Sequence, residues 1–95
     1  MNVRGANISQ MTEQEICEEA VRKFGETRQM LQCVEECGEL VQAVVKYVTE
    51  RQNVQRVLEE VADMEICLKQ IRIMHDAQTI DRARIEQLKK LKSYL

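Results

Sequence analysis

The sequence lacks proline and tryptophan altogether, and its 95 residues include only three glycines and three aromatic side chains, Phe24, Tyr47 and Tyr94. Because proline and glycine interrupt helices, their scarcity, with a hydrophobic share of 44%, is the composition of a helical protein. A chain of this length forms one domain that exposes much of its surface when alone, so partners, including copies of itself, are expected.

Long apolar runs and basic runs are also missing. No apolar run could span a membrane, and residues 1–4 lack the apolar segment of a secretory signal. The formal net charge is -2, and no cluster of Lys and Arg is interleaved with aromatic side chains. We therefore expect a cytoplasmic protein that binds neither a membrane nor a nucleic-acid polymer. The net charge is still compatible with binding of a nucleotide that arrives as its magnesium complex.

The chain has one histidine, His75, and four cysteines, none in a Cys-x-x-Cys pair, so a zinc site or a disulfide framework has little support. All four cysteines fall within helical patterns, where a cytosolic thiol usually behaves as a small buried hydrophobe. We predict that all four pack in the core. They are Cys17, Cys33, Cys37 and Cys67.

Apolar residues at spacings of three and four predict four helices. Residues 1–11 have no such period and are expected to be a loose arm, which leaves residues 12–95 as the single domain. Short connections favour antiparallel neighbours, so we expect an all-α, antiparallel helical bundle with two long central helices and shorter N- and C-terminal helices. The helices are expected over about residues 12–23, 26–49, 54–75 and 80–93.

Individual residues mark the expected helix ends. Thr12 and Glu15 fit a capping box at the start of the first helix, and Gly25 should end it. Asn53 is the expected N-cap of the third helix, and residues 76–79 should break the pattern before the last one.

Two acidic segments carry carboxylates three residues apart, Glu36 with Glu39 and Glu60 with Asp63, a spacing that places both members of a pair on one helix face. Four acids on two facing helices repel one another unless a cation lies between them. An all-oxygen set without histidine suits Mg²⁺, or Mn²⁺, better than zinc or iron. Gly38, between the first two acids, indicates a close approach by another helix or a ligand, or else simple tolerance of a helix glycine.

Helical geometry divides these acids into two unlike pairs. Glu60 lies near the middle of an apolar stripe with Asp63 about 60° to one side, so both are expected to be embedded and to need pairing or a metal. Glu36 and Glu39 lie at the border of their apolar arc, where a phosphate-bearing substrate could reach a shared metal. The alternative for each pair is a solvated acidic surface.

The combination of Glu-Glu-x-x-Glu at 35–39 and Glu-x-x-Asp at 60–63 resembles the MazG-like, all-α nucleoside triphosphate pyrophosphohydrolases. The resemblance covers about residues 24–91 and includes Gly25 and Gln29 ahead of the first motif. It implies a Mg²⁺-dependent homodimer or homotetramer that cleaves a (d)NTP to the monophosphate and pyrophosphate.

The resemblance also implies roles for individual residues, with Glu36 or Glu39 as the catalytic base for the attacking water. The implied metal ligands are Glu36, Glu39, Glu60 and Asp63, with Glu35 and Glu59 as auxiliary acids. The candidate substrate-binding residues are Gln29, Gln32, Lys46, Lys89 and Lys90. A basic end of the last helix is equally favourable against the helix dipole without a ligand, and the few aromatics leave no evident platform for a nucleobase.

A non-catalytic helical oligomerisation or regulatory module is the alternative function, because the chain is small and its third helix is apolar almost all round. On that helix Ile66 and Ile73 lie opposite Met64 and Ile71, and one short neighbouring helix leaves them without cover. We therefore predict self-association.

Overall fold

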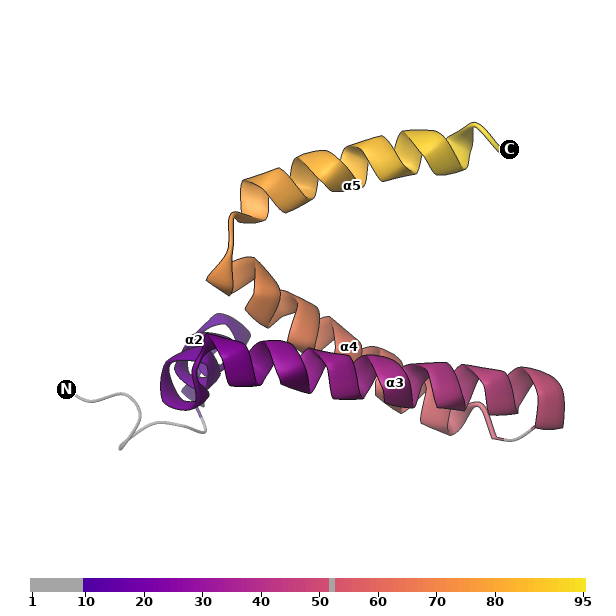
Figure 1. The fold of residues 1–95 in the computed structure, drawn as a ribbon, viewed down its shortest axis with the longest axis horizontal. Coiled ribbons are helices and arrows are strands. Elements are labelled where there is room, and N and C mark those ends of the chain that lie inside the picture. Colours follow the sequence, from indigo (N-terminus) through magenta and orange to yellow (C-terminus); the bar gives the residue numbers. More distant parts are fainter. Residues whose placement is uncertain (1–9, 52) are drawn as a thin grey trace.

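The computed structural model describes residues 10–51 and 53–95, and in this part of the chain it contains helices and no strand. The all-α prediction is therefore confirmed. The helices are α2 (Glu13–Phe24), α3 (Glu26–Glu50), α4 (Gln55–Met74) and α5 (Ala77–Lys92). The two longest, α3 and α4, run side by side as an antiparallel pair, and α2 packs against both where α3 begins and α4 ends (Figure 1). No helix in the described part of the chain is both long and apolar enough to cross a membrane.

Local signals set both ends of α2 as predicted. The Thr12 hydroxyl accepts a hydrogen bond of 3.1 Å from the Glu15 backbone N–H, and the Glu15 carboxylate accepts one of 3.0 Å from the Thr12 N–H. This reciprocal pair is the predicted capping box. Gly25 has a φ of 88°, which side chains other than glycine rarely adopt, so a single residue both ends α2 and starts α3.

The starts of the two later helices differ from the prediction. Val54, not Asn53, is the N-cap residue of α4, although the Asn53 side chain still accepts a 2.8 Å hydrogen bond from the Gln55 N–H. Helix α5 begins at Ala77, so residues 77–79 do not break the helix. Asp76 caps it by accepting hydrogen bonds of 3.0 Å from the Gln78 N–H and 2.7 Å from the Thr79 hydroxyl.

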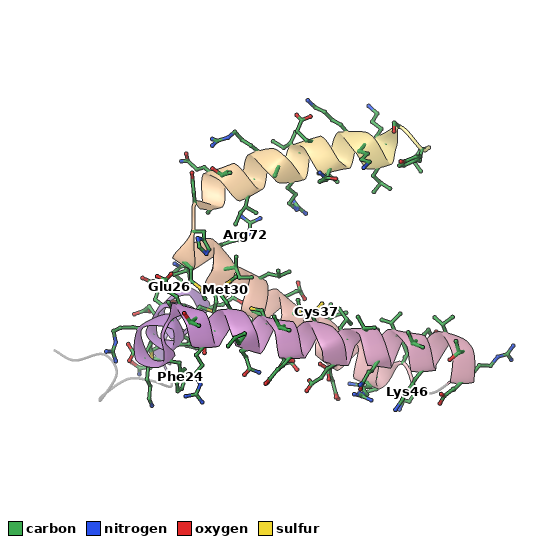
Figure 2. The ribbon with its side chains drawn as sticks, viewed as in Figure 1. Phe24, Glu26, Met30, Cys37, Lys46 and Arg72 are labelled. Atoms are coloured by element: carbon green, nitrogen blue, oxygen red, sulfur yellow. The ribbon has the colours of Figure 1, made fainter. Side chains whose placement is uncertain are left out.

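The core consists of small side chains. Cys17, Cys33, Ala43 and Cys67 are buried, and all four cysteines are free thiols. The prediction of a buried Cys37 is wrong, because that residue is exposed. Figure 2 shows Cys37 and Lys46 on opposite sides of the α3 ribbon.

Helix α5 stands away from the rest of the fold (Figure 1). None of its described residues is buried, and an ion pair of 2.6 Å between Arg72 and Asp81 ties its first turns to α4. Beside that contact, a cavity of about 480 Å³ opens between α4 and α5, lined in part by Leu68, Ile71 and Ile80. The apolar side of α5 is therefore largely uncovered.

Candidate metal centre

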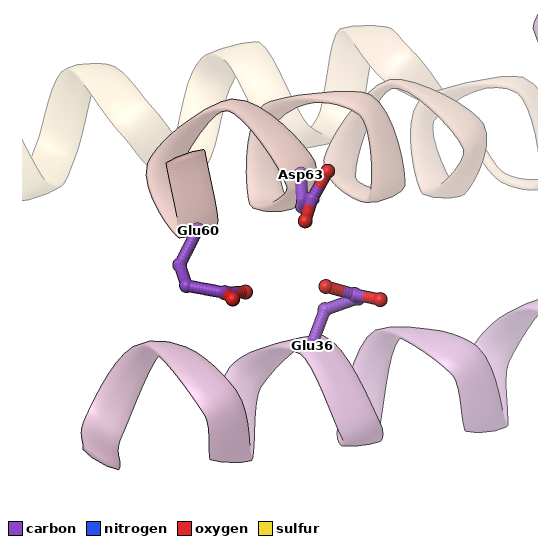
Figure 3. A group of neighbouring side chains, drawn as sticks. All are labelled: Glu36, Glu60 and Asp63. Atoms are coloured by element: carbon purple, nitrogen blue, oxygen red, sulfur yellow. The ribbon is translucent and has the colours of Figure 1, made fainter. Parts of the chain in front are cut away.

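Three carboxylates meet between α3 and α4 (Figure 3). Glu36 comes from α3, and Glu60 and Asp63 come from one face of α4, three residues apart. One oxygen of each carboxylate lies within 4.8 Å of the others. The structure thus brings together three of the four acids that the sequence singled out.

The two half-buried acids of this group each have an unsatisfied oxygen. Glu36 and Glu60 are half-buried, and the Oε2 atom of each is closed to solvent without a hydrogen-bond partner in the described part of the chain. A buried carboxylate oxygen without a donor is costly, and a cation among the three acids would satisfy both atoms.

The expected division into an embedded pair and a rim pair is wrong. Each helix contributes one half-buried acid, Glu36 or Glu60, and one exposed acid, Glu39 or Asp63. The reason lies in how α3 packs, because the face that it turns to α4 contains the buried Cys33 and extends to Glu36.

Electrostatic repulsion is concentrated on Glu60. Partial burial raises the pKa of its carboxyl above the ordinary value, and the charges of Glu39, Asp63 and Glu36 raise this pKa further, as does a hydrogen bond with Glu39. Glu39 therefore lies close to the group although it is not one of the three converging acids. A bound cation would reverse the sign of this field at Glu60.

This raised pKa predicts that Glu60→Gln stabilises the metal-free protein at pH 7. The native state binds the Glu60 proton more tightly than the unfolded chain does. Protonated Glu60 therefore stabilises the wild type fully below the ordinary pKa of a glutamate, and this stabilisation is lost as the pH rises through the raised pKa of the native state. Thermal melts in EDTA between pH 4 and pH 8 should show a higher Tm for the variant at pH 7 and a shrinking difference towards pH 4. Glu65→Gln, an exposed control on the same helix, should show no such trend. A wild type as stable as Glu60→Gln at pH 7 would contradict the prediction.

Two buried thiols lie beneath the acids without joining them as ligands. The Cys33 thiol donates a 3.5 Å hydrogen bond to the Cys67 carbonyl oxygen. Burial, the neighbouring Cys33 and the charges of Glu36 and Asp63 raise the pKa of Cys67 to about 12. Neither sulfur belongs to the group of converging ligand atoms, so the candidate ligands in the described part of the chain are carboxylate oxygens.

The two candidate glutamines of α3 have different surroundings. Gln32 donates a 3.0 Å hydrogen bond from Nε2 to Oε1 of Glu36, which holds that carboxylate from outside the group. Gln29 is buried instead, and its Nε2 donates a 2.7 Å hydrogen bond to Oε1 of the equally buried Gln70 on α4. Gln32 therefore touches the acid group, whereas Gln29 lies within the helix interface.

The other candidate residues lie outside the three-acid group. Glu35 and Glu59 are exposed, and Glu59 accepts a 3.3 Å hydrogen bond from Gln55. The lysine candidates are exposed as well. Lys46 lies on α3, and Lys89 and Lys90 lie on α5, where Lys89 pairs with Glu86 at 3.1 Å. Because α5 stands apart from α3 (Figure 1), the fold does not bring its two lysines to the acids.

Sequence reasoning missed Arg28 and the role of Phe24. The Arg28 guanidinium lies 5.1 Å from the centre of the half-exposed Phe24 ring, and the two residues line a cavity of about 250 Å³ with Gln29 and Gln32. The signal was present in the spacing, because Arg28, Gln32 and Glu36 follow one another at intervals of four on one side of α3. A basic and aromatic cavity therefore adjoins the acid group through Gln32.

The chemistry of the three carboxylates suits a hard divalent cation. Mg²⁺ held by a few carboxylates keeps further coordination positions for water and for phosphate oxygens. The adjoining cavity gives room for a ligand that extends beyond the acids. No family model, curated protein or solved structure matches this chain.

Proposed function

We propose that this chain is a Mg²⁺-dependent nucleoside triphosphate pyrophosphohydrolase, which cleaves a (d)NTP between the α and β phosphates into the monophosphate and pyrophosphate. The observation that carries the proposal is the three-acid group with two buried, unpartnered carboxylate oxygens. The likeness of its two acidic motifs to the MazG-like enzymes supports this reaction type. The enzyme would act as a homo-oligomer in the cytoplasm, where its four thiols stay reduced.

Each residue of the site has a role in this reaction. Glu36, Glu60 and Asp63 would hold Mg²⁺, or alternatively Mn²⁺, and Gln32 would keep Glu36 in place. The ion supplies charge neutralisation for the polyphosphate and a lowered pKa for a bound water. Glu39 is exposed beside Glu60 and would accept the proton of the attacking water.

A substrate panel tests this function. The protein is incubated with canonical and modified nucleoside triphosphates and Mg²⁺, and pyrophosphate and nucleoside monophosphate are measured. We expect both products in equal amounts from at least one triphosphate, and their loss when EDTA removes the metal. The absence of turnover across the whole panel would overturn the proposal.

A non-catalytic helical module is the second candidate, favoured by the many exposed apolar side chains of α3 and α5. Metal binding distinguishes the two, because a ligand that binds the native state raises its stability. Under the enzymatic proposal, millimolar Mg²⁺ or Mn²⁺ raises the Tm. An unchanged Tm would favour the module.

A further inference from the structure

Two basic side chains meet over one aromatic ring where α2 ends and α3 begins, at the residue labelled Phe24 in Figure 2. The Lys23 Nζ atom lies 5.5 Å from the centre of the Phe24 ring, and the Arg28 guanidinium carbon lies 5.1 Å from it. Neither cation forms an ion pair within the described part of the chain. No carboxylate of these residues lines the adjoining cavity of about 250 Å³. A positively charged cavity therefore lies next to the acid group.

The stability of α3 does not explain the position of Arg28. This residue lies in the first turn of α3, which has no side-chain cap and where the helix dipole is positive. A cation is repelled at this end of a helix, whereas Lys23, in the last turn of α2, is favoured by the dipole. Glu26, the acid of the same turn, does not line the cavity. The unpaired guanidinium and the helix dipole together favour an anion beside Arg28.

Arg28 lies on the side of α3 that leads to the acid group through Gln32. At a rise of 1.5 Å per residue, Arg28 and Glu36 are about 12 Å apart along the helix axis. The long side chain of Arg28 is exposed and held only by its weak contact with Phe24, so it can turn towards Gln32. A ligand with several phosphates in a row could then contact a metal among the acids with one phosphate and Arg28 with another.

The chemistry of the cavity suits phosphate better than a nucleobase. A stacked base needs a free aromatic face, and both cations already lie over the Phe24 ring. The amides of the lining, Gln29 and Gln32, each already donate a hydrogen bond to another side chain. Arg28 offers a fork of N–H donors, which matches two oxygens of one phosphate.

We propose that Arg28, with Lys23 beside it, forms a subsite for the pyrophosphate part of the nucleoside triphosphate. The inference rests on the proposed function, because it concerns the same substrate and the metal of the acid group. Lys89 and Lys90, which were expected to bind the substrate, lie on α5 away from the acids (Figure 1). The subsite thus supplies the positive charge for the phosphates from the start of α3 instead.

Titration calorimetry with inorganic pyrophosphate and Mg²⁺ tests the subsite without any turnover. Arg28→Met keeps most of the side-chain length but removes the charge, so the pyrophosphate Kd should rise at least about tenfold through the loss of charge-assisted hydrogen bonds. Arg28→Lys should regain part of the affinity, because it keeps the charge without the fork. Arg82→Met is the matched control, since it removes one positive charge from an exposed position on α5, and it should keep the wild-type Kd.

Phe24→Leu separates phosphate binding from packing. It removes the ring contact but keeps the charge of Arg28, so the pyrophosphate Kd should stay close to that of the wild type. A Kd raised as much in Phe24→Leu as in Arg28→Met would overturn the proposal, and so would a wild type that does not bind pyrophosphate. A nucleoside monophosphate that loses affinity in Arg28→Met, while pyrophosphate does not, would assign the cavity to the nucleoside and overturn the proposal as well.

Failure of the subsite can be told apart from failure of the proposed reaction. Triphosphate turnover with an unchanged KM and an unchanged pyrophosphate Kd in Arg28→Met would overturn the subsite and leave the proposed reaction intact. Pyrophosphate binding that depends on Arg28, without turnover of any triphosphate, would support the phosphate subsite and contradict the proposed reaction.

Discussion

Asp63→Asn should lower the rate of pyrophosphate release by roughly 100-fold or more. Mutation of a residue that only hydrogen-bonds to a metal ligand already lowers metal affinity or activity by about 10–100-fold, and Asp63 is a proposed ligand itself. The substitution removes one of three converging negative charges and keeps the shape of the side chain. Asp63 is exposed, so a loss of activity cannot be attributed to a disrupted core. Initial rates at increasing Mg²⁺ concentration measure the effect, and the rise of Tm on adding Mg²⁺ should disappear in the same variant.

Two further variants make this result specific. Glu65→Gln removes a carboxylate from an exposed position two residues further along α4 and should keep both the rate and the response to Mg²⁺. Glu39→Gln should lower kcat while leaving the Mg²⁺-dependent rise of Tm largely intact, because Glu39 is assigned to the water rather than to the ion. An Asp63→Asn variant with the wild-type rate and wild-type Mg²⁺ dependence would contradict the assignment of the three acids.

The parts of the fold that follow from neighbouring residues could be predicted from the sequence. The capping box of Thr12 and Glu15 and the end of the first helix at Gly25 are decided within one turn of chain, and both predictions are confirmed. The predicted start of α5 was wrong because residue types such as Asp76 and Thr79 are common both in loops and in helix N-caps. Asp76 acts as the N-cap because its carboxylate accepts hydrogen bonds from the Thr79 hydroxyl and the Gln78 N–H. That geometry cannot be predicted from the residue types alone.

The site is less predictable because burial depends on how two helices pack. Spacing shows that Glu60 and Asp63 share a face, but not which of them turns inward. The rotation of α3 and α4 about their axes decides which acids turn inward. It places Glu36 in the interface while leaving Cys37 exposed. The same packing leaves apolar residues of α3 such as Val34 and Val41 exposed, and their spacing alone cannot distinguish them from core residues.

Gln29→Met and Gln70→Met should each lower the free energy of unfolding by about 1–3 kcal/mol, the usual penalty for a buried polar group that loses its partner. The two side chains form a buried hydrogen bond of 2.7 Å between α3 and α4, and methionine has nearly the same length and volume as glutamine. The double variant should recover most of this loss, because it leaves no polar atom of the pair without a partner. Urea unfolding of the four proteins measures the coupling.

The same four proteins also distinguish two roles for Gln29. The family resemblance suggested a substrate-binding residue, whereas the structure places Gln29 in the helix interface. If Gln29 acts by packing alone, the double variant regains stability and keeps the KM of the wild type. If Gln29 also contacts the nucleotide, the double variant is stable but its KM rises, while Gln70→Met alone leaves KM unchanged. Purely additive losses of stability would contradict the packing role, because two partners in one hydrogen bond must be coupled.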